Sequence, residues 1–146
     1  MTDENAPAIK VAKLRYAGKE QFIGESPSGH AIIASFAHEH STAASPMELL
    51  LISLGGCTGA DVSSILQKKR QRVTSYEIEV RAQRREEHPR IYTNIEIIHF
   101  VKGYNIDEKA VAHAIELSET KYCSVSAMLS ASATITTRYE IEQESE

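Results

Sequence analysis

The sequence predicts an α+β fold with antiparallel sheets, and three observations lead to this prediction. Segments with strand character come in groups, one long apolar helix follows the first group, and shorter helices follow the second. Grouped rather than strictly alternating elements are typical of α+β proteins. The length of 146 residues favours one domain. We place that domain at residues 9–142, between a disordered leader (1–8) and a short tail (143–146).

Three strands are expected at the start of the chain, over residues 8–17, 20–25 and 30–36. The residues between them are rich in Gly, Pro and Ser, which favour turns. Consecutive strands joined by short turns form an antiparallel meander, so we expect a three-stranded sheet. Residues 37–44 are predicted to form a loop.

A long helix is expected from residue 46 to about residue 71. Ser45 is suited to the N-cap, Pro46 to the first helical position, and Glu48 completes the capping-box pattern Ser-x-x-Glu. The first half of the helix is apolar almost all round, and such a helix is normally buried on every side.

A β-hairpin should follow this helix. Apolar and charged residues alternate over residues 76–82, which is typical of a half-buried strand. The turn at 86–89 leads to a second strand over 90–102, which Gly103 is expected to end.

The C-terminal part is predicted to contain two helices and a last strand. Asn105 and Glu108 form a second capping-box pattern, which opens a helix over residues 106–121. A short helix over 124–131 and a strand over 133–142 complete the chain. Two buried helices and about six strands are many for one small core, so we expect two copies of the chain to share a core.

The charge pattern argues against nucleic acid and membranes as partners. The formal net charge is −4 and there is no long basic block, whereas both partners require clustered Lys and Arg. The N-terminus is acidic and polar, unlike a signal peptide. The mostly apolar stretch 47–57 is too short to span a bilayer. We therefore expect a cytoplasmic protein, in which cysteines are kept reduced.

Cys57 lies in the segment Gly55-Gly56-Cys57-Thr58-Gly59, inside the predicted long helix. Each glycine costs about 1 kcal/mol relative to alanine in a helix interior. Close approach of the backbone to another helix is the simplest compensation. The spacing alone leaves two alternatives for Cys57, since free cysteine is also a common core residue: an inert buried side chain or a reactive thiol.

Cys123 lies at the start of the short C-terminal helix. Backbone N–H groups and the positive end of the helix dipole can stabilise a thiolate there. Cys57, in the middle of a helix, lacks that help and would need a nearby cation to become a nucleophile. Arg15, Lys19 and Arg90 are the candidate cations.

Four other polar residues are weaker candidates for a site. The capping box explains Glu48 without catalysis, although a catalytic role stays open for it. His38 and His40 have the spacing of two metal ligands, but the loop offers no third one. We expect no metal and no cofactor. His113 falls on the second helix and is interpreted as a structural histidine.

A family resemblance gives these residues a common context. The segment Ser45-Pro46-Met47-Glu48-Leu49-Leu50, which runs into Gly55-Gly56-Cys57, resembles the OsmC/Ohr family, and so does Cys123 at the start of a short helix. The resemblance covers about residues 9–141. The segments that especially resemble the YhfA-like branch are 65–68, 84–87 and 121–125.

The resemblance implies an OsmC-like fold in a tightly intertwined homodimer, with two long helices packed back to back. It also implies thiol-dependent reduction of organic hydroperoxides in oxidative-stress defence. Cys57 would attack the peroxide and become a sulfenic acid, and Cys123 would condense with it to a disulfide. An external dithiol, such as a lipoylated protein, would restore both thiols.

The sequence departs from the peroxidase branches at two activating positions. Those branches have a glutamate directly after the loop proline, where this chain has Met47 and places Glu48 one step further on. They also have an arginine in the first turn, where this chain has Lys19 and Glu20. Lys does not replace the planar fork of Arg. Two alternatives therefore stay open. One is a binding protein for a small hydrophobic or electrophilic molecule, with passive or redox-sensing cysteines, and the other is two thiols that only fill space.

Overall fold

The computed structural model describes residues 7–146, and within it the chain divides into two compact units. The N-terminal unit ends at Leu49 and the C-terminal unit spans Leu50–Glu146. Most of the leader predicted over residues 1–8 lies outside the described residues.

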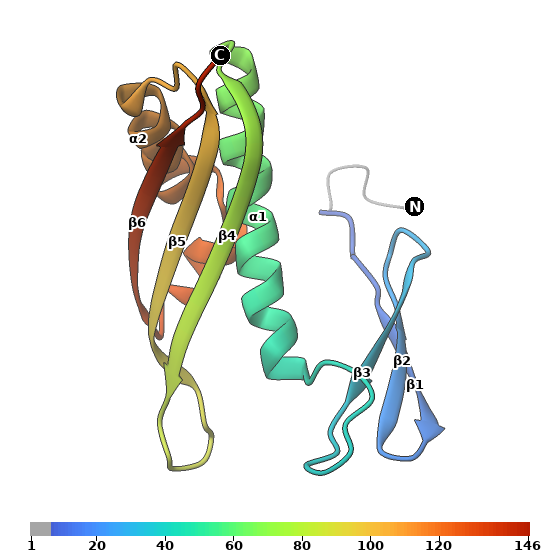
Figure 1. Cartoon of the computed structure of the whole chain (residues 1–146). Coiled ribbons are helices and arrows are strands. Elements are labelled where there is room, and N and C mark those ends of the chain that lie inside the picture. Colours follow the sequence, from blue (N-terminus) through green and yellow to red (C-terminus); the bar gives the residue numbers. More distant parts are fainter. Residues whose placement is uncertain (1–6) are drawn as a thin grey trace. The chain divides into compact units, whose positions relative to one another are not determined.

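The N-terminal unit contains the predicted three-stranded meander. Strands β1 (Lys13–Gly18), β2 (Gln21–Glu25) and β3 (Ala31–Ser35) pair antiparallel in the order β1-β2-β3 (Figure 1). Lys19 and Glu20 between the first two strands have φ values of 51° and 59°. Two positive φ angles are the signature of the tight turn that matches the twist of a hairpin.

Helix α1 (Pro46–Lys68) begins at the predicted residue. The backbone N–H of Glu48 donates to Ser45 Oγ at 3.2 Å, and the backbone N–H of Ser45 donates to Glu48 Oε1 at 3.2 Å. The predicted capping box is confirmed. The helix ends at Lys68 rather than near residue 71, because Arg70 turns the chain with a φ of 57°.

The C-terminal unit is built on a second three-stranded sheet. Strands β4 (Arg72–Arg84) and β5 (Tyr92–Tyr104) form the predicted antiparallel hairpin. Strand β6 (Thr134–Gln143) pairs with β5 in parallel, which corrects the expectation of antiparallel sheets. A parallel pair needs a long crossover, and here three helical segments supply it.

These segments are α2 (Glu108–Leu117), the π-helical turn η1 (Ser118–Tyr122) and α3 (Ser124–Leu129). The N-cap of α2 is Asp107, whose carboxylate accepts a hydrogen bond from the backbone N–H of Lys109. The capping box predicted for residues 105 and 108 is therefore wrong. A φ of 49° places Asn105 in the turn before the cap.

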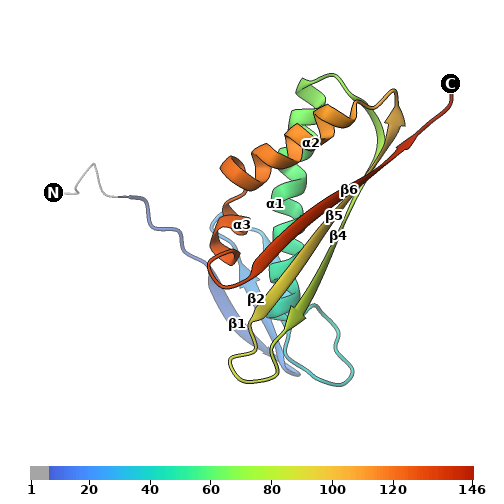
Figure 2. The same ribbon diagram turned by 90° about the vertical axis from the view of Figure 1, so that its left-hand side faces the viewer.

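The helices of the C-terminal unit pack on one face of its sheet, and their apolar side chains form the core (Figures 1 and 2). The predicted burial of α1 on every side is wrong for the single chain. Leu50 is 37% exposed and Ile52 is 63% exposed. The core residues are Val62, Leu66, Val101, Ile106, Ala110, Val111, Ala114 and Ile115.

The glycines around Cys57 allow α1 to lie close to the sheet. A Cβ atom at Gly59 would lie 2.7 Å from Ile78 Cδ1, and one at Gly55 would lie 3.3 Å from Val80 Cγ2. Both neighbours belong to β4, so the predicted contact with another helix is replaced here by a contact with a strand. A Cβ at Gly56 would meet nothing within 4 Å.

Gly103 is required by a close approach of two backbones. A Cβ atom there would lie 2.1 Å from the carbonyl oxygen of Arg72, and β5 continues past it to Tyr104 instead of ending. Because the obstacle is main chain, it cannot rotate away. We expect Gly103→Ala to lower the free energy of unfolding by about 3 kcal/mol or more. Denaturant unfolding would measure this. Gly24→Ala is the matched control, because a Cβ atom there would meet its nearest atoms at an ordinary 3.7 Å; an equal effect of both variants would contradict the argument.

Helix α1 is also the one helix among residues 7–146 that is long and apolar enough to cross a membrane by length and composition. The expectation concerned the mostly apolar stretch 47–57, which is shorter than the whole helix Pro46–Lys68. The core helix of a soluble protein passes the same test. Here α1 buries four side chains, those of Leu54, Thr58, Val62 and Leu66.

Candidate functional site

The structure brings the two cysteines together, although they are far apart in the sequence. The sulfur atoms of Cys57 and Cys123 and a carboxylate oxygen of Asp61 all lie within 4.8 Å of one another. Both cysteines are free thiols. The predicted pair therefore forms one cluster, and Asp61 is a third member that was not predicted from the sequence.

Local structure explains how these three side chains meet. Cys57 and Asp61 are four residues apart on α1, and this spacing puts them on one face of a helix. Cys123 is the N-cap of α3 and accepts a hydrogen bond from the backbone N–H of Ser126, with an N···S distance of 3.4 Å. Its own N–H donates to the carbonyl of Ser118 at 2.8 Å, which closes the π-helical turn η1. Such turns are frequent at functional sites.

Cys123 is a protonated thiol at neutral pH. Burial raises its pKa to about 11, against the lowering effect of the Ser126 N–H. A hydrogen bond to the Cys57 sulfur and the negative charge of Asp61 raise the pKa further. The backbone N–H at the helix start favours the thiolate, as expected, but the side chain is only 4% exposed and desolvation is the larger effect.

The Ser118 hydroxyl holds the carboxylate of Asp61 in place. The Ser118 hydroxyl lies 2.8 Å from Asp61 Oδ2 and 3.0 Å from Thr58 Oγ1. A hydroxyl carries one proton, and Ser118 donates it to the carboxylate as the stronger, charged acceptor, while Thr58 Oγ1 is a second acceptor within its reach. None of the ion pairs among residues 7–146 includes Asp61.

A signal for Asp61 was present in the sequence. It stands four residues after Cys57 and is one of few charged residues in an otherwise apolar helix. The partners Thr58 and Ser118 carry no comparable signal, since they meet only through tertiary packing.

A buried tyrosine–histidine pair belongs to the same unit. Tyr76 Oη lies 2.6 Å from His99 Nδ1, and the two rings stack. Burial lowers the pKa of His99 to about 4, while burial and the charge of Asp61 raise the pKa of Tyr76. Both rings are therefore neutral at pH 7. Nε2 of His99 has no hydrogen-bond partner within residues 7–146.

The shift at His99 predicts a loss of stability in mild acid. An unfolded histidine has a pKa of about 6.5, so above that pH neither state binds the extra proton. Between a pH of about 6.5 and the folded pKa of about 4, the unfolded chain binds more protons than the folded chain. Stability therefore falls as the pH falls through this range. We expect His99 to lower the free energy of unfolding by about 2 kcal/mol from pH 7.5 to pH 5.

Denaturant unfolding at the two pH values would measure this loss. His99→Gln should remove it from the pH dependence, whatever the variant does to stability at pH 7.5. His113→Gln, at an exposed position of α2, is the matched control and should keep the wild-type pH dependence. A His99→Gln variant with the wild-type pH dependence would contradict the assignment.

The other predicted site residues belong to other segments of the chain. Glu48, Arg15 and Lys19 belong to the N-terminal unit, where Glu48 closes the capping box. Arg90 is exposed in the loop between β4 and β5, and its carbonyl accepts a hydrogen bond from Arg84 Nε at 2.8 Å. Within residues 7–146, the group with metal-ligand spacing is the cysteine–aspartate cluster and not the histidines of the loop 37–44.

A cavity of about 490 Å³ reaches Asp61. Its wall combines apolar side chains with Lys68 and Lys69 from the end of α1. This volume is in the range of small-molecule sites. The lining residues are Ala60, Asp61, Ser64, Ile65, Lys68, Lys69, Leu117 and Tyr122.

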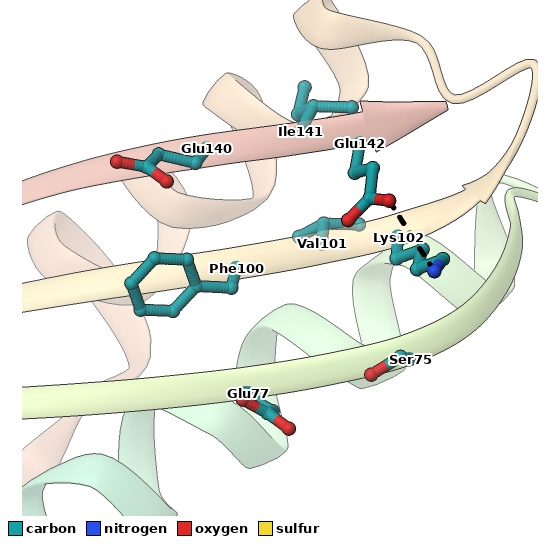
Figure 3. A pocket seen from close by; sticks show the side chains of 8 residues that line it. All are labelled: Ser75, Glu77, Phe100, Val101, Lys102, Glu140, Ile141 and Glu142. Carbon is teal, nitrogen blue, oxygen red and sulfur yellow. Dashed lines mark ion pairs between the residues drawn. The ribbon is translucent and has the colours of Figure 1, made fainter. Parts of the chain in front are cut away.

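A second hollow, of about 380 Å³, lies over the strands of the sheet (Figure 3). Strand pairing puts Ser75, Lys102 and Glu142 in one row across it. Lys102 Nζ pairs with Glu142 Oε1 at 3.4 Å. The lining of this hollow has no thiol, so the cysteine cluster is the better candidate site.

The comparison with protein families identifies the family of this chain. A family model described as "OsmC-like protein" matches residues 38–138. The chain belongs to the OsmC family. Protein YhfA of Escherichia coli (strain K12) is 43% identical over 130 residues, which cover 89% of this chain and 96% of that protein.

Solved structures extend the agreement to the fold. A crystal structure of a hypothetical protein from Aquifex aeolicus VF5 has a TM-score of 0.84 and 37% identity, over 95% of this chain and 100% of that one. An organic hydroperoxide resistance protein from Elizabethkingia anophelis has a TM-score of 0.64 and 10% identity, over 96% of this chain and 99% of that one. At that identity the likeness shows the OsmC fold alone.

Proposed function

We propose that this OsmC family protein reduces organic hydroperoxides with its two thiols. The observation that carries the proposal is the meeting of Cys57 and Cys123, whose sulfur atoms lie within 4.8 Å of each other. A thiol beside a newly formed sulfenic acid favours a disulfide over further oxidation. The fold shared with an organic hydroperoxide resistance protein supports the same chemistry.

The two thiols differ in access, which supports different tasks for them. Cys57 is half-buried, whereas Cys123 is buried, so a peroxide reaches Cys57 more readily. The Cys57 thiolate attacks one peroxide oxygen, the O–O bond breaks, and the alcohol leaves with a proton. Cys57 is then a sulfenic acid, oxidised by two electrons.

Resolution of the sulfenic acid needs the proton of Cys123 to be removed, because burial keeps this thiol protonated. The carboxylate of Asp61 is within 4.8 Å of both sulfur atoms and is the base that we propose for this step. The Cys123 sulfur attacks Cys57, an S–S bond forms and water leaves. An external dithiol, for example a lipoylated protein, then returns two electrons and two protons.

Disulfide formation requires a movement of Cys123. The sulfur atoms must approach to about 2.05 Å. Cys57 is fixed in the middle of a long helix, while Cys123 lies between a π-helical turn and a helix of 6 residues. The movement is therefore expected on the Cys123 side. Reduced thiols between turnovers fit a cytoplasmic location.

We also propose that two copies of the chain form a homodimer. Ile52 is 63% exposed on α1, and Gly56, one turn further along the helix, leaves open space for an approaching backbone. Exposed apolar faces of this kind mark interaction sites. The implied partner is a second copy of the same helix.

The alternative function is the binding of a small hydrophobic or electrophilic molecule, with Cys57 and Cys123 as passive or sensory groups. The cavity of about 490 Å³ beside Asp61 supports it. Consumption of cumene hydroperoxide by the reduced protein, with excess dithiol, separates the two. No consumption with lipoylated protein, dihydrolipoamide or dithiothreitol would overturn the peroxidase and favour the binding protein.

A further inference from the structure

The cysteine cluster has the composition of a site for a soft divalent metal ion. Its three members offer two sulfur atoms and one carboxylate oxygen, all within 4.8 Å of one another. Thiolates select zinc and similar ions over magnesium or calcium, which prefer oxygen ligands. The sequence pattern with metal-ligand spacing is His38-x-His40 in the loop 37–44. In the structure the three grouped ligand atoms belong instead to α1 and to the start of α3.

The distances fit a tetrahedral zinc site after small side-chain movements. With Zn–S bonds of about 2.3 Å, two thiolates on one zinc ion are about 3.8 Å apart. The ligand atoms of the cluster are at most 4.8 Å apart, so each has to move by less than about 1 Å. Cys57 and Asp61 reach the ion from one helix face, at the spacing of four residues that helical metal sites use.

The surroundings of Asp61 match those of a metal-binding carboxylate. Ser118 holds Oδ2 at 2.8 Å, and Thr58 Oγ1 lies 3.0 Å from the same hydroxyl. None of the described hydrogen bonds within residues 7–146 uses Oδ1, which is therefore available to an ion. Outer hydrogen bonds such as that of Ser118 orient the ligands of protein metal sites. Since no ion pair within residues 7–146 includes Asp61, a cation would also supply its missing counter-charge.

We propose that Cys57, Asp61 and Cys123 of the reduced protein form a binding site for Zn²⁺. Both sulfurs bind the ion as thiolates, and water completes the tetrahedron from the exposed side of Cys57. The site needs both sulfurs reduced but no peroxide chemistry, so it does not rest on the proposed peroxidase. Where both hold, Zn²⁺ and peroxide compete for the Cys57 sulfur, and zinc inhibits turnover.

Cobalt provides the direct test, since it replaces zinc in such sites and absorbs light. The reduced, metal-free protein is titrated with Co²⁺ under anaerobic conditions. We expect one ion per chain, a thiolate-to-cobalt charge-transfer band in the near ultraviolet, and loss of the band on adding Zn²⁺. Zinc binding in weak buffer should release protons into solution, because sulfur ligands bind the ion as thiolates. The protein oxidised to the disulfide should bind neither ion.

Two variants assign the ligands. Asp61→Asn keeps the shape of the side chain and both sulfurs, and should weaken Zn²⁺ binding by about tenfold or more. Cys57→Ser should weaken the charge-transfer band as well. Glu86→Gln, in the exposed loop between β4 and β5, removes a carboxylate without touching the cluster and should bind as the wild type does.

The outcomes separate this proposal from the peroxidase. Cobalt bound without a thiolate band, no binding at all, or an unchanged affinity of Asp61→Asn would each overturn the metal site. Peroxide consumption by the metal-free protein is measured in the same samples. Cobalt binding without peroxide consumption would support the metal site and contradict the peroxidase. Peroxide consumption without cobalt binding would support the peroxidase and contradict the metal site.

Discussion

Replacement of Cys57 by serine is expected to abolish peroxide consumption, by at least about 100-fold, because the attacking sulfur is gone. Cys123→Ser is expected to give a different defect. Its Cys57 still attacks the peroxide, but no thiol lies beside the sulfenic acid, so the reaction should stop after one equivalent. Dithiol-dependent consumption of cumene hydroperoxide measures both variants, and trapping of the sulfenic acid with dimedone distinguishes them.

The control must show that these losses are chemical and not structural. Ser63→Ala lies on the same helix as Cys57, and its hydroxyl donates only within the helix, to Ala60 O at 3.2 Å. Ser63→Ala should consume peroxide like the wild type. The melting temperatures of Cys57→Ser, Cys123→Ser and Ser63→Ala should all lie within a few degrees of the wild-type value. If Cys57→Ser keeps the wild-type rate, the chemistry does not occur at this sulfur.

Two elements that follow from local signals, the start of α1 and the first strand of the hairpin, were predicted correctly. The capping box of Ser45 and Glu48 defines the start of α1, and the alternation over residues 76–82 defines a strand of the hairpin. Both depend on neighbours a few residues away. The parallel pairing of β6 with β5 depends on where a long crossover returns to the sheet. No local pattern carries that information.

The site likewise combines features that the sequence predicts with features that depend on tertiary packing. The family resemblance identified Cys57 and Cys123, and the structure brings their sulfurs together. The effect of the helix start on Cys123 has the predicted direction, but sequence position does not give the burial that outweighs it and raises the pKa of the thiol. The hydrogen bonds that link Ser118 to Thr58 and Asp61 join α1 to the π-helical turn. They arise only when the two helical segments pack.

Replacement of Ile52 by lysine is expected to separate the proposed homodimer into single chains. The Ile52 side chain is 63% exposed in the chain by itself and lies on the apolar part of α1. In a dimer with two α1 helices in contact, the two introduced ammonium groups would lose water without gaining a partner charge. The cost should weaken association by about 100-fold or more. Sedimentation velocity over a range of protein concentrations measures the dissociation constant.

The matched control for this variant is Gln67→Lys, which adds the same charge to an exposed position of the same helix. It should sediment as a dimer, like the wild type, because position 67 lies outside the proposed contact. A monomeric wild type would contradict the homodimer itself. A dimeric Ile52→Lys would keep the dimer but move its contact away from α1. The exposure of Ile52 and the open space at Gly56 would then need another occupant, and peroxide consumption by the separated chains would show whether the cysteine cluster works without a partner.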